Sequence, residues 1–318
     1  MVVPIDSLCK ADVARVGGKG ANLGELTRLG VPIVPGFVVT APAYFRFLDE
    51  AELRPRAEQL LSGLDVNDSA SLDRVAAGLR LLIAGAAMPE EIAAAITAAY
   101  AELNAGAVAV RSSATAEDLA DASFAGQQET YLNVEGAAEV VPAVQNCWAS
   151  LFEARAIFYR ASGGFGQLGV GIAVVVQRMV QSERSGVMFT VHPVTNDTTQ
   201  VVIEAVYGLG EAIVSGLVSP DMYVIDKATG ALIDKQVTPQ EREYVRCPVA
   251  SPAEDTNHWI DVDWGRRTKQ KLTDEEAAQL AAIGQRLEQH FGCPQDIEWA
   301  HAGGSFYILQ SRAVTTII

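Results

Sequence analysis

Apolar residues recur at helical spacing in two stretches of the first half of the chain. Residues 71 to 103 are rich in alanine, and Pro89 suits the first turn of a helix. The positions that fall on one helical face there are Ile92, Ala95, Ile96, Ala99 and Leu103. A further helix is expected over residues 139 to 160, with a buried stripe of Val140, Val144, Trp148 and Leu151.

From residue 169 onward the pattern changes to short β-branched runs separated by Gly, Pro and Asn, which is typical of strands and turns. The runs are Ile172 to Gln177, Val187 to Val191, Val201 to Val206 and Met222 to Asp226. We therefore expect a mixed α/β (α+β) fold with two subdomains. The first covers residues 1–176, and the second, rich in sheet, covers residues 177–318.

The last predicted helix has the clearest boundaries. Thr273 stands three residues before Glu276, which is the spacing of a capping box. Gly292 follows the last apolar position and is expected to end the helix. Its apolar stripe is Leu280, Ile283, Leu287 and Phe291.

Composition and charge narrow the class of protein. Hydrophobic residues make up 49% and charged residues 20% of the chain, as in ordinary globular proteins. The net charge is -15, from 24 Lys+Arg against 39 Asp+Glu, which disfavours nucleic acid as a partner. The same charge opposes a nucleotide, so a nucleotide site here needs its own cations and a metal ion.

Cysteine usage and hydropathy indicate a cytoplasmic location. The cysteines Cys9, Cys147, Cys247 and Cys293 are far apart and form no C-x-x-C pair, so we expect reduced thiols. The N-terminus shows no basic stretch followed by an apolar one, as a signal peptide would. The longest apolar run, residues 169 to 176, is too short to cross a membrane.

The first candidate motif is Gly17-Gly18-Lys19-Gly20. Small residues let the backbone approach a phosphate, and a lysine can neutralise it. The spacing is not that of a Walker A loop. A glycine-rich phosphate-binding loop and a purely structural turn both remain open for this motif alone.

The second motif is an apolar strand that ends in a polar loop, residues 107 to 118, with Arg111 followed by Ser112 and Ser113. Arginine binds phosphate in a planar fork. The loop continues to Thr130 and resembles a flap whose backbone amides cover a triphosphate. The alternative for Arg111 is a salt bridge at a strand end.

The third motif is a C-terminal hairpin over residues 296 to 312. Asp296 and Glu298 share one face of the first strand, and Gln310 and Arg312 share one face of the second. The two faces coincide only if paired residue numbers have an even sum, as with a loop over residues 301 to 305. Such a face could bind a hard cation and phosphate, or could be an exposed face with ordinary cross-strand pairs.

Several long stretches, in this order, resemble the phosphoenolpyruvate synthase and pyruvate phosphate dikinase family. They are VGGKGANLGEL…GVPIVPGFVVT (16–40), AVRSSATAEDLADASFAGQQETYLNV (109–134), GVMFTVHPVT (186–195), YGLGEAIVSGLVSPDMYVIDK (207–227) and CPQDIEWA…FYILQSR (293–312). The resemblance covers almost the whole chain. Rifampicin phosphotransferases are similarly close, above all in the stretch around residues 291 to 299.

The resemblance implies an ATP-grasp fold that binds ATP and Mg²⁺ between its two subdomains. By the same resemblance, Lys19 and Arg111 hold phosphates and Arg312 contacts the phosphoryl group in transfer. Glu298 and Gln310 bind Mg²⁺, and Asp296 supports them.

The resemblance also implies contacts to the rest of the nucleotide. The backbone of the segment that begins at Gln177 and includes Met179 and Val180 is expected to meet the adenine. Glu211 is expected to reach the ribose.

The reaction that the resemblance implies passes the β-phosphoryl of ATP to a histidine, leaving AMP and phosphate. Family members carry this histidine in a Thr-Ser-His-like loop, and His192, His258, His290 and His301 do not match it. We therefore expect the histidine domain to be a separate partner, in cis or in trans. The final acceptor is pyruvate, a rifamycin or another compound, and a non-catalytic ATP sensor is the alternative. Ala313 stands where many family members have proline.

Overall fold

The computed structural model describes residues 1–115, 129–247 and 256–315. The chain divides into two compact units, each described here by itself. Unit 1 contains residues 1–25 and 35–179, and unit 2 contains residues 26–34 and 180–318.

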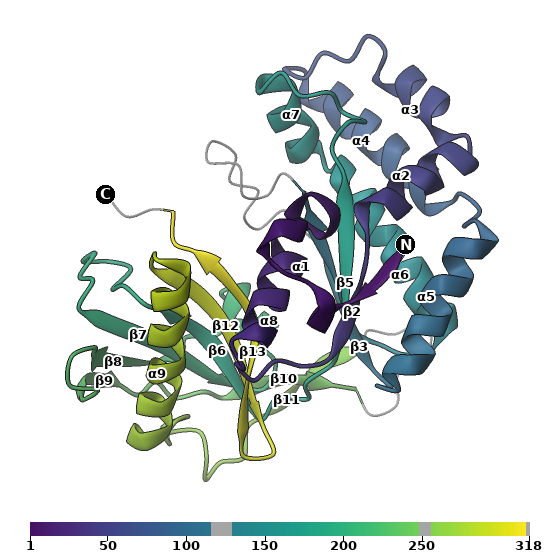
Figure 1. The fold of residues 1–318 in the computed structure, drawn as a ribbon. Helices are drawn as coiled ribbons and strands as arrows, with labels where there is room; N and C mark the ends of the chain where they lie inside the picture. Colours follow the sequence, from purple (N-terminus) through teal and green to yellow (C-terminus); the bar gives the residue numbers. More distant parts are fainter. Residues whose placement is uncertain (116–128, 248–255, 316–318) are drawn as a thin grey trace. The chain divides into compact units, whose positions relative to one another are not determined.

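Unit 1 is built on a five-stranded sheet in the order β1-β2-β5-β3-β4, in which every neighbouring pair is antiparallel (Figure 1). The strands are β1 (Val2–Pro4), β2 (Gly36–Val39), β3 (Val108–Ala114), β4 (Thr130–Val134) and β5 (Ile172–Arg178). One face carries Val108, Val110, Val174 and Val176 into the hydrophobic core. The helices that contribute to this core are α2 (Ala41–Glu50), α3 (Leu53–Leu61), α4 (Ser69–Ala84), α5 (Glu90–Leu103), α6 (Ala137–Ala149) and α7 (Ala154–Ser162).

The alanine-rich stretch forms α4 and α5 as expected, with Pro89 at the N-cap of α5. The single helix predicted over residues 139 to 160 is wrong. The chain forms α6, a 3-10 turn (Ser150–Phe152) and α7, because Glu153 leaves the helical conformation, with φ -59° and ψ 142°. The apolar stripe continues across this break, since Leu151 and Phe152 in the 3-10 turn are buried like Trp148 in α6.

Unit 2 is built on a six-stranded antiparallel sheet in the order β13-β12-β6-β7-β8-β9. The strands are β6 (Arg184–Phe189), β7 (Gln200–Tyr207), β8 (Asp221–Asp226), β9 (Leu232–Gln236), β12 (Gln295–Ala302) and β13 (Ser305–Ala313). A separate hairpin consists of β10 (Arg242–Arg246) and β11 (Asn257–Asp261). The β-branched runs that predict strands from residue 172 to 226 therefore do form strands.

The helix α9 (Asp274–Phe291) lies along one face of this sheet (Figure 1). Its capping box between Thr273 and Glu276 is formed, and Gly292 ends it in the left-handed conformation, as expected. Close packing fixes which face it covers. A Cβ on Gly284 would lie 2.8 Å from the Met188 methyl group, so the Met188 side of the sheet faces α9.

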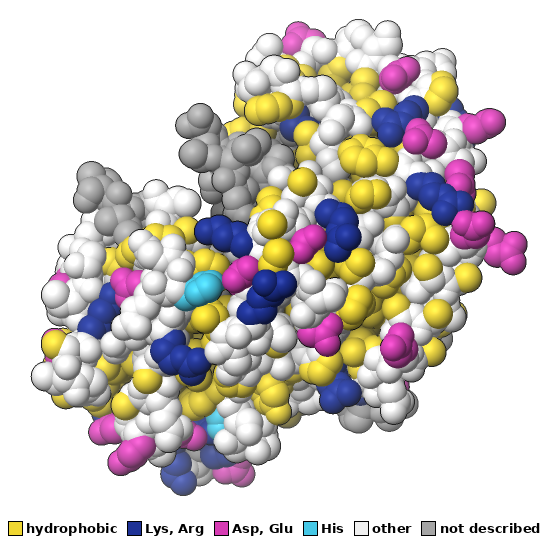
Figure 2. All heavy atoms as spheres, in the orientation of Figure 1, with side chains coloured by type: hydrophobic (Ala, Val, Ile, Leu, Met, Phe, Trp, Pro, Cys, Tyr) yellow, Lys and Arg dark blue, Asp and Glu magenta, His cyan; other side chains and the backbone are white. Residues whose placement is uncertain are grey.

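Charged side chains of both signs lie on the surface of the protein. Lys and Arg side chains are interspersed with Asp and Glu side chains on the face drawn in Figure 2. Within the described parts of the chain, no helix combines the length and apolar character needed to span a bilayer.

Candidate functional site

Lys19 lies just after a sharp break in a helix. The glycine-rich stretch predicted as a loop is instead part of α1 (Val13–Arg28), which departs from helical geometry at Gly17. Gly17 has φ 70°, and a Cβ there would lie 2.3 Å from the Ser113 hydroxyl oxygen. Only glycine fits this approach, so the break and the first turn after it, which holds Lys19, are fixed against β3.

Ser113 connects this turn to the strand that carries Arg111. Its buried hydroxyl donates to the Val16 carbonyl at 2.9 Å and accepts from the Gly20 amide at 3.4 Å. Arg111 belongs to β3, and the Ser113 side chain of the same strand holds the turn that carries Lys19. Two cationic residues that are 92 positions apart in sequence are thereby fixed to one strand. The sequence drew attention to Ser113 only as a neighbour of Arg111, and its hydrogen bonds to residues 16 and 20 required the fold.

Arg111 and Gln177 lie on the face of the unit 1 sheet that points away from the helical core. Arg111 pairs with Val175, and Gln177 pairs with Ala109 on the same strand as Arg111. Directly opposed residues of an antiparallel pair share a face, and strand side chains alternate. The neighbours Val110 and Val176 enter the core, so Arg111 and Gln177 face the other way.

Gln177 shows the feature expected of a ligand-binding side chain. It is 2% exposed, and its Nε2 has no hydrogen-bond partner among the residues that the structure describes. A buried amide donor that lacks an acceptor costs about 1–3 kcal/mol, so an acceptor on a ligand would stabilise it.

The other predicted nucleotide contacts are divided between the units. Met179 belongs to unit 1, and its amide donates to the Ala107 carbonyl at 2.9 Å, so this amide is already used. Val180 begins the longer part of unit 2. Glu211 is the exposed first residue of the short helix α8 (Glu211–Val214) in unit 2.

The expected hairpin of β12 and β13 forms, and its turn consists of Gly303 and Gly304, which have φ 58° and 76°. A loop over residues 301 to 305, which would give even sums in a regular hairpin, is not the one that forms. Two glycines with positive φ are typical of the tight turns that join antiparallel strands.

A shift in the register between β12 and β13 places Gln310 on the same face of the sheet as Glu298. Near the turn, Trp299 pairs with Ile308, an odd sum, but beyond it Glu298 pairs with Gln310 and Asp296 with Arg312, both even. The strand β13 thus contains one more residue than β12 at this point, which is a β-bulge. Since Ile297 pairs with Met188, which faces α9, the four polar residues lie on the opposite face.

Asp296 and Arg312 form an ion pair on this face. The Arg312 Nη2 and Nε atoms lie 2.7 Å and 2.9 Å from the Asp296 Oδ2 atom. Burial raises the pKa of Asp296, Arg312 acts to lower it, and Glu298 raises it further. The Arg312 side chain is 44% exposed, so its guanidinium remains accessible to a phosphate.

A further carboxylate, Glu204 on β7, was not predicted. It lies in the same cross-strand row as Glu298, because both pair with Val187 of the intervening β6. Burial raises the pKa of Glu204, with a further contribution from Asp296. In the sequence, Glu204 stands out as an acidic residue inside an apolar strand. Only the strand order shows that its side chain lies on the same face of the sheet as Glu298.

The donor set fits a hard divalent cation that is completed by phosphate oxygens. Glu298 and Gln310 offer side-chain oxygens from directly opposed positions. The described residues contain no group of three or more His, Cys, Asp or Glu side chains that could hold a metal by themselves. The predicted phosphate flap, residues 116–128, lies outside the described residues.

Comparison with known proteins shows the family to which the chain belongs. The family profile described as "Pyruvate phosphate dikinase, AMP/ATP-binding domain" matches residues 13–317. A probable phosphoenolpyruvate synthase of Methanocaldococcus jannaschii is 47% identical over 98% of this chain and 26% of its own length. The corresponding protein of Methanothermobacter thermautotrophicus is 48% identical over 98% of this chain and 46% of its length.

A rifampicin phosphotransferase of a Streptomyces species is also similar, with 43% identity over 100% of this chain and 36% of its own length. The chain therefore spans about a quarter to a half of the relatives it matches. The family profile covers nearly all of the sequence, and the chain belongs to the pyruvate phosphate dikinase AMP/ATP-binding domain family.

Proposed function

We propose that the chain is the ATP-grasp module of a phosphoenolpyruvate synthase-like dikinase, which binds ATP with Mg²⁺ and transfers the β-phosphoryl group. The observation that carries this proposal is the arrangement of two cross-strand pairs, Glu298–Gln310 and Asp296–Arg312, on one face of one hairpin. Phosphoryl transfer depends on positioning and charge neutralisation, for which this set of groups is suited.

In this proposal each of the predicted residues contacts a particular part of the nucleotide. Lys19 and Arg111 neutralise phosphate oxygens from unit 1, where Ser113 fixes the turn that carries Lys19. The backbone of the segment from Gln177 to Val180, including the Met179 carbonyl, contacts the adenine. The Gln177 Nε2 atom, which has no hydrogen-bond partner among the described residues, supports a ligand at the start of this segment. Glu211 accepts hydrogen bonds from the ribose.

Glu298 and Gln310 hold the metal ion in the proposed complex. When bound, Mg²⁺ supplies charge neutralisation and orients the phosphoryl group. Arg312 exchanges part of its interaction with Asp296 for the phosphoryl group in transfer, and Asp296 keeps the guanidinium aligned.

The phosphoryl group passes to a histidine on a separate domain or subunit, and AMP and phosphate remain. The final acceptor in a protein like the archaeal relatives is pyruvate. The 43% identity to the Streptomyces rifampicin phosphotransferase supports a second candidate, in which the final acceptor is a rifamycin. A non-catalytic ATP sensor is disfavoured because Lys19, Arg111, Glu298, Gln310 and Arg312 are all present.

The test mixes the protein with labelled ATP and Mg²⁺, with and without a histidine domain of the family, and follows AMP. We expect ATP and Mg²⁺ to stabilise the protein against heat, and AMP to form only when the histidine domain is added. Arg312→Ala should retain much of the binding and lose the transfer. Rapid AMP release without the histidine domain, unaffected by Arg312→Ala, would contradict the proposal.

A further inference from the structure

A buried glutamine, Gln240, holds the end of strand β7 by its backbone. It is 3% exposed, and its Oε1 accepts from the Tyr207 amide at 2.8 Å. Its Nε2 donates to the Tyr207 carbonyl at 3.0 Å and to the Arg242 carbonyl at 2.9 Å. The side-chain amide thus pairs with both backbone groups of Tyr207, in the way a neighbouring strand would.

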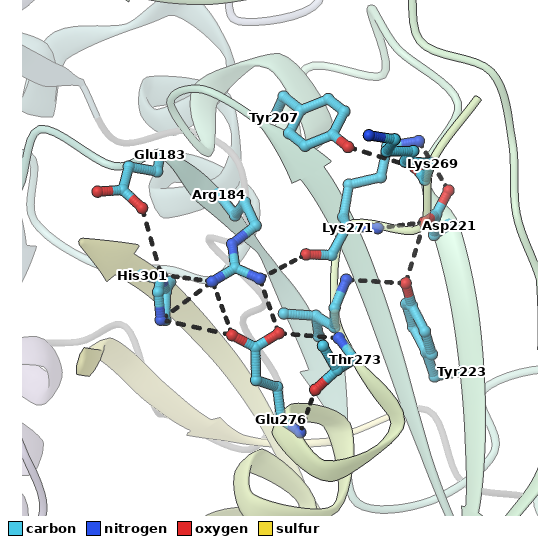
Figure 3. A network of polar contacts seen from close by, with 11 residues as sticks. Glu183, Arg184, Tyr207, Asp221, Tyr223, Lys269, Lys271, Thr273, Glu276 and His301 are labelled. Carbon is cyan, nitrogen blue, oxygen red and sulfur yellow. Dashed lines mark hydrogen bonds and ion pairs between the residues drawn. The ribbon is translucent and has the colours of Figure 1, made fainter. Parts of the chain in front are cut away.

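The side chain of Tyr207 is fixed as well. Its ring lies under two cations, with Arg266 Cζ 4.3 Å and Lys271 Nζ 5.3 Å from the ring centroid. Its hydroxyl lies 3.3 Å from the Lys269 carbonyl, and Lys271 is itself paired with Asp221 at 2.7 Å (Figure 3). Tyr207 is therefore a rigid point from which the following residues extend.

Those following residues form the turn that presents Glu211. Gly208 has φ 86°, and a Cβ there would lie 2.5 Å from the Tyr244 carbonyl oxygen. The Gly208 carbonyl accepts from the Ser182 and Ser185 hydroxyls at 2.9 Å and 2.7 Å. Leu209 and Ala212 are then buried, while Glu211 between them is exposed.

We propose that Gln240 is a positioning residue for Glu211 and thereby sets the preference of this protein for nucleotides that carry ribose hydroxyls. The inference rests on the proposed function, in which Glu211 contacts the ribose. Gln240 reaches Tyr207 from the segment between β9 and β10, 33 positions further along the chain. Its removal frees both backbone groups of the residue from which the Glu211 turn begins.

Hydroxyl recognition is the property most sensitive to this positioning. A carboxylate that accepts hydrogen bonds from vicinal hydroxyls loses them when it moves by a fraction of a hydrogen-bond length. Contacts to the triphosphate come from other elements and are unaffected by the turn. A displaced Glu211 therefore lowers the discrimination between nucleotides more than it lowers the affinity for ATP.

Unit 1 offers a matched control. Gln145 is also buried, at 6% exposed, and its Nε2 donates to the carbonyls of Ile83, Ala84 and Ala86 at 2.7, 3.2 and 2.8 Å. Gln145→Met removes a comparable set of hydrogen bonds and lies in the helical layer, so it should destabilise the protein without changing ribose discrimination.

The experiment measures Kd for ATP and for 2′,3′-dideoxyATP, both with Mg²⁺, by titration calorimetry. The proteins are the parent, Glu211→Gln, Gln240→Met and Gln145→Met, with Gln240→Asn as a milder variant that keeps the amide on a shorter side chain. We expect the parent to favour ATP on the order of tenfold, as lost hydrogen bonds to a charged acceptor predict. Gln240→Met should reduce this ratio to about that of Glu211→Gln, Gln240→Asn should lie between, and Gln145→Met should keep the parent ratio.

The outcomes separate the inference from the function on which it rests. A parent protein that binds neither nucleotide overturns the proposed function and the inference together. A parent that binds both equally, or Gln240 variants that keep the parent ratio, overturn the inference and leave ATP binding standing. If Gln240→Met does not fold, the ratio of Gln240→Asn decides the question.

Discussion

Glu298 lies directly opposite Gln310 because β13 contains one more residue than β12 between these positions and the turn. In a regular hairpin with the same two-glycine turn, Gln310 would lie opposite Ile297, on the face that α9 covers. The bulge at residues 308–310 therefore decides whether the two proposed metal ligands share a face.

Replacing Gln310 by methionine tests the proposed metal ligand at nearly constant volume. We expect Gln310→Met to weaken Mg-ATP binding about tenfold or more, because a thioether is a poor ligand for a hard cation. Mn²⁺ binding followed by electron paramagnetic resonance checks the metal directly. Gln289→Met, on the exposed side of α9, is the control and should change neither measurement. Equal Mn²⁺ affinity in both variants would remove Gln310 from the metal site.

Gly17 should not tolerate a side chain. Gly17→Ala places a Cβ 2.3–2.4 Å from the Ser113 hydroxyl and carbonyl oxygens at a positive φ, so we expect a loss of about 2–4 kcal/mol in the free energy of unfolding. Gly78→Ala in α4 is the control: its Cβ would lie 3.6 Å from Leu60, and it should gain about 0.5–1 kcal/mol from helix propensity. Urea unfolding measures both. Equal stability of the two variants would show that the Gly17–Ser113 approach is not required.

Removing one partner of the buried ion pair between Lys271 and Asp221 should lower the free energy of unfolding. Their side chains are fully buried, with Nζ 2.7 Å from Oδ1 (Figure 3). We expect Lys271→Met to cost about 3–5 kcal/mol, because the Asp221 charge loses its counter-ion. The double variant with Asp221→Asn should cost less than Lys271→Met alone.

An exposed pair on the same unit is the control for that experiment. Lys235 lies 2.6 Å from Asp274, but their side chains are 29% and 53% exposed. Lys235→Met should change the free energy of unfolding by less than about 1 kcal/mol. A loss for Lys271→Met that is no larger than this would mean that the buried pair does not stabilise unit 2.

His301 should make the protein less stable in mild acid. The Arg184 Nη2 atom lies 2.9 Å from its Nδ1, and the Glu183 and Glu276 carboxylates lie 3.8 Å from the ring nitrogens (Figure 3). Burial, followed by Arg184, lowers the pKa of His301 below its ordinary value of 6.5, while Glu276 and Glu183 act to raise it. The folded protein therefore favours neutral His301.

The pH dependence follows from this direction. The contribution of neutral His301 to the free energy of unfolding is complete above the pKa of about 6.5 that histidine has in the unfolded chain. This contribution is lost as the pH falls through the lower pKa of His301 in the folded state. We expect the difference in unfolding free energy between pH 7.5 and pH 5 to shrink in His301→Gln, as measured by urea unfolding at each pH. Identical pH profiles for the parent and His301→Gln would contradict this prediction.

Patterns among neighbouring residues were sufficient to predict many of the helices and strands. The capping box at Thr273 and the apolar stripes of α5 and α9 act over a few residues, so the sequence alone predicts these helices. The β-branched runs that became β5 to β8 were predictable for the same reason. The break at Glu153 was not, because the 3-10 turn before it keeps the apolar stripe buried and leaves the spacing of the pattern almost unchanged.

For the candidate site, the residue types could be predicted from the sequence: cations at 19, 111 and 312, and candidate oxygen ligands at 298 and 310. Three relationships required the folded chain: the β13 bulge turns Gln310 toward Glu298, Ser113 ties the Lys19 turn to β3, and Glu204 shares a row with Glu298. These relationships join residues brought together by strand order and register. Such pairings depend on the packing of whole sheets, whereas helix and strand signals arise from neighbouring residues along the chain.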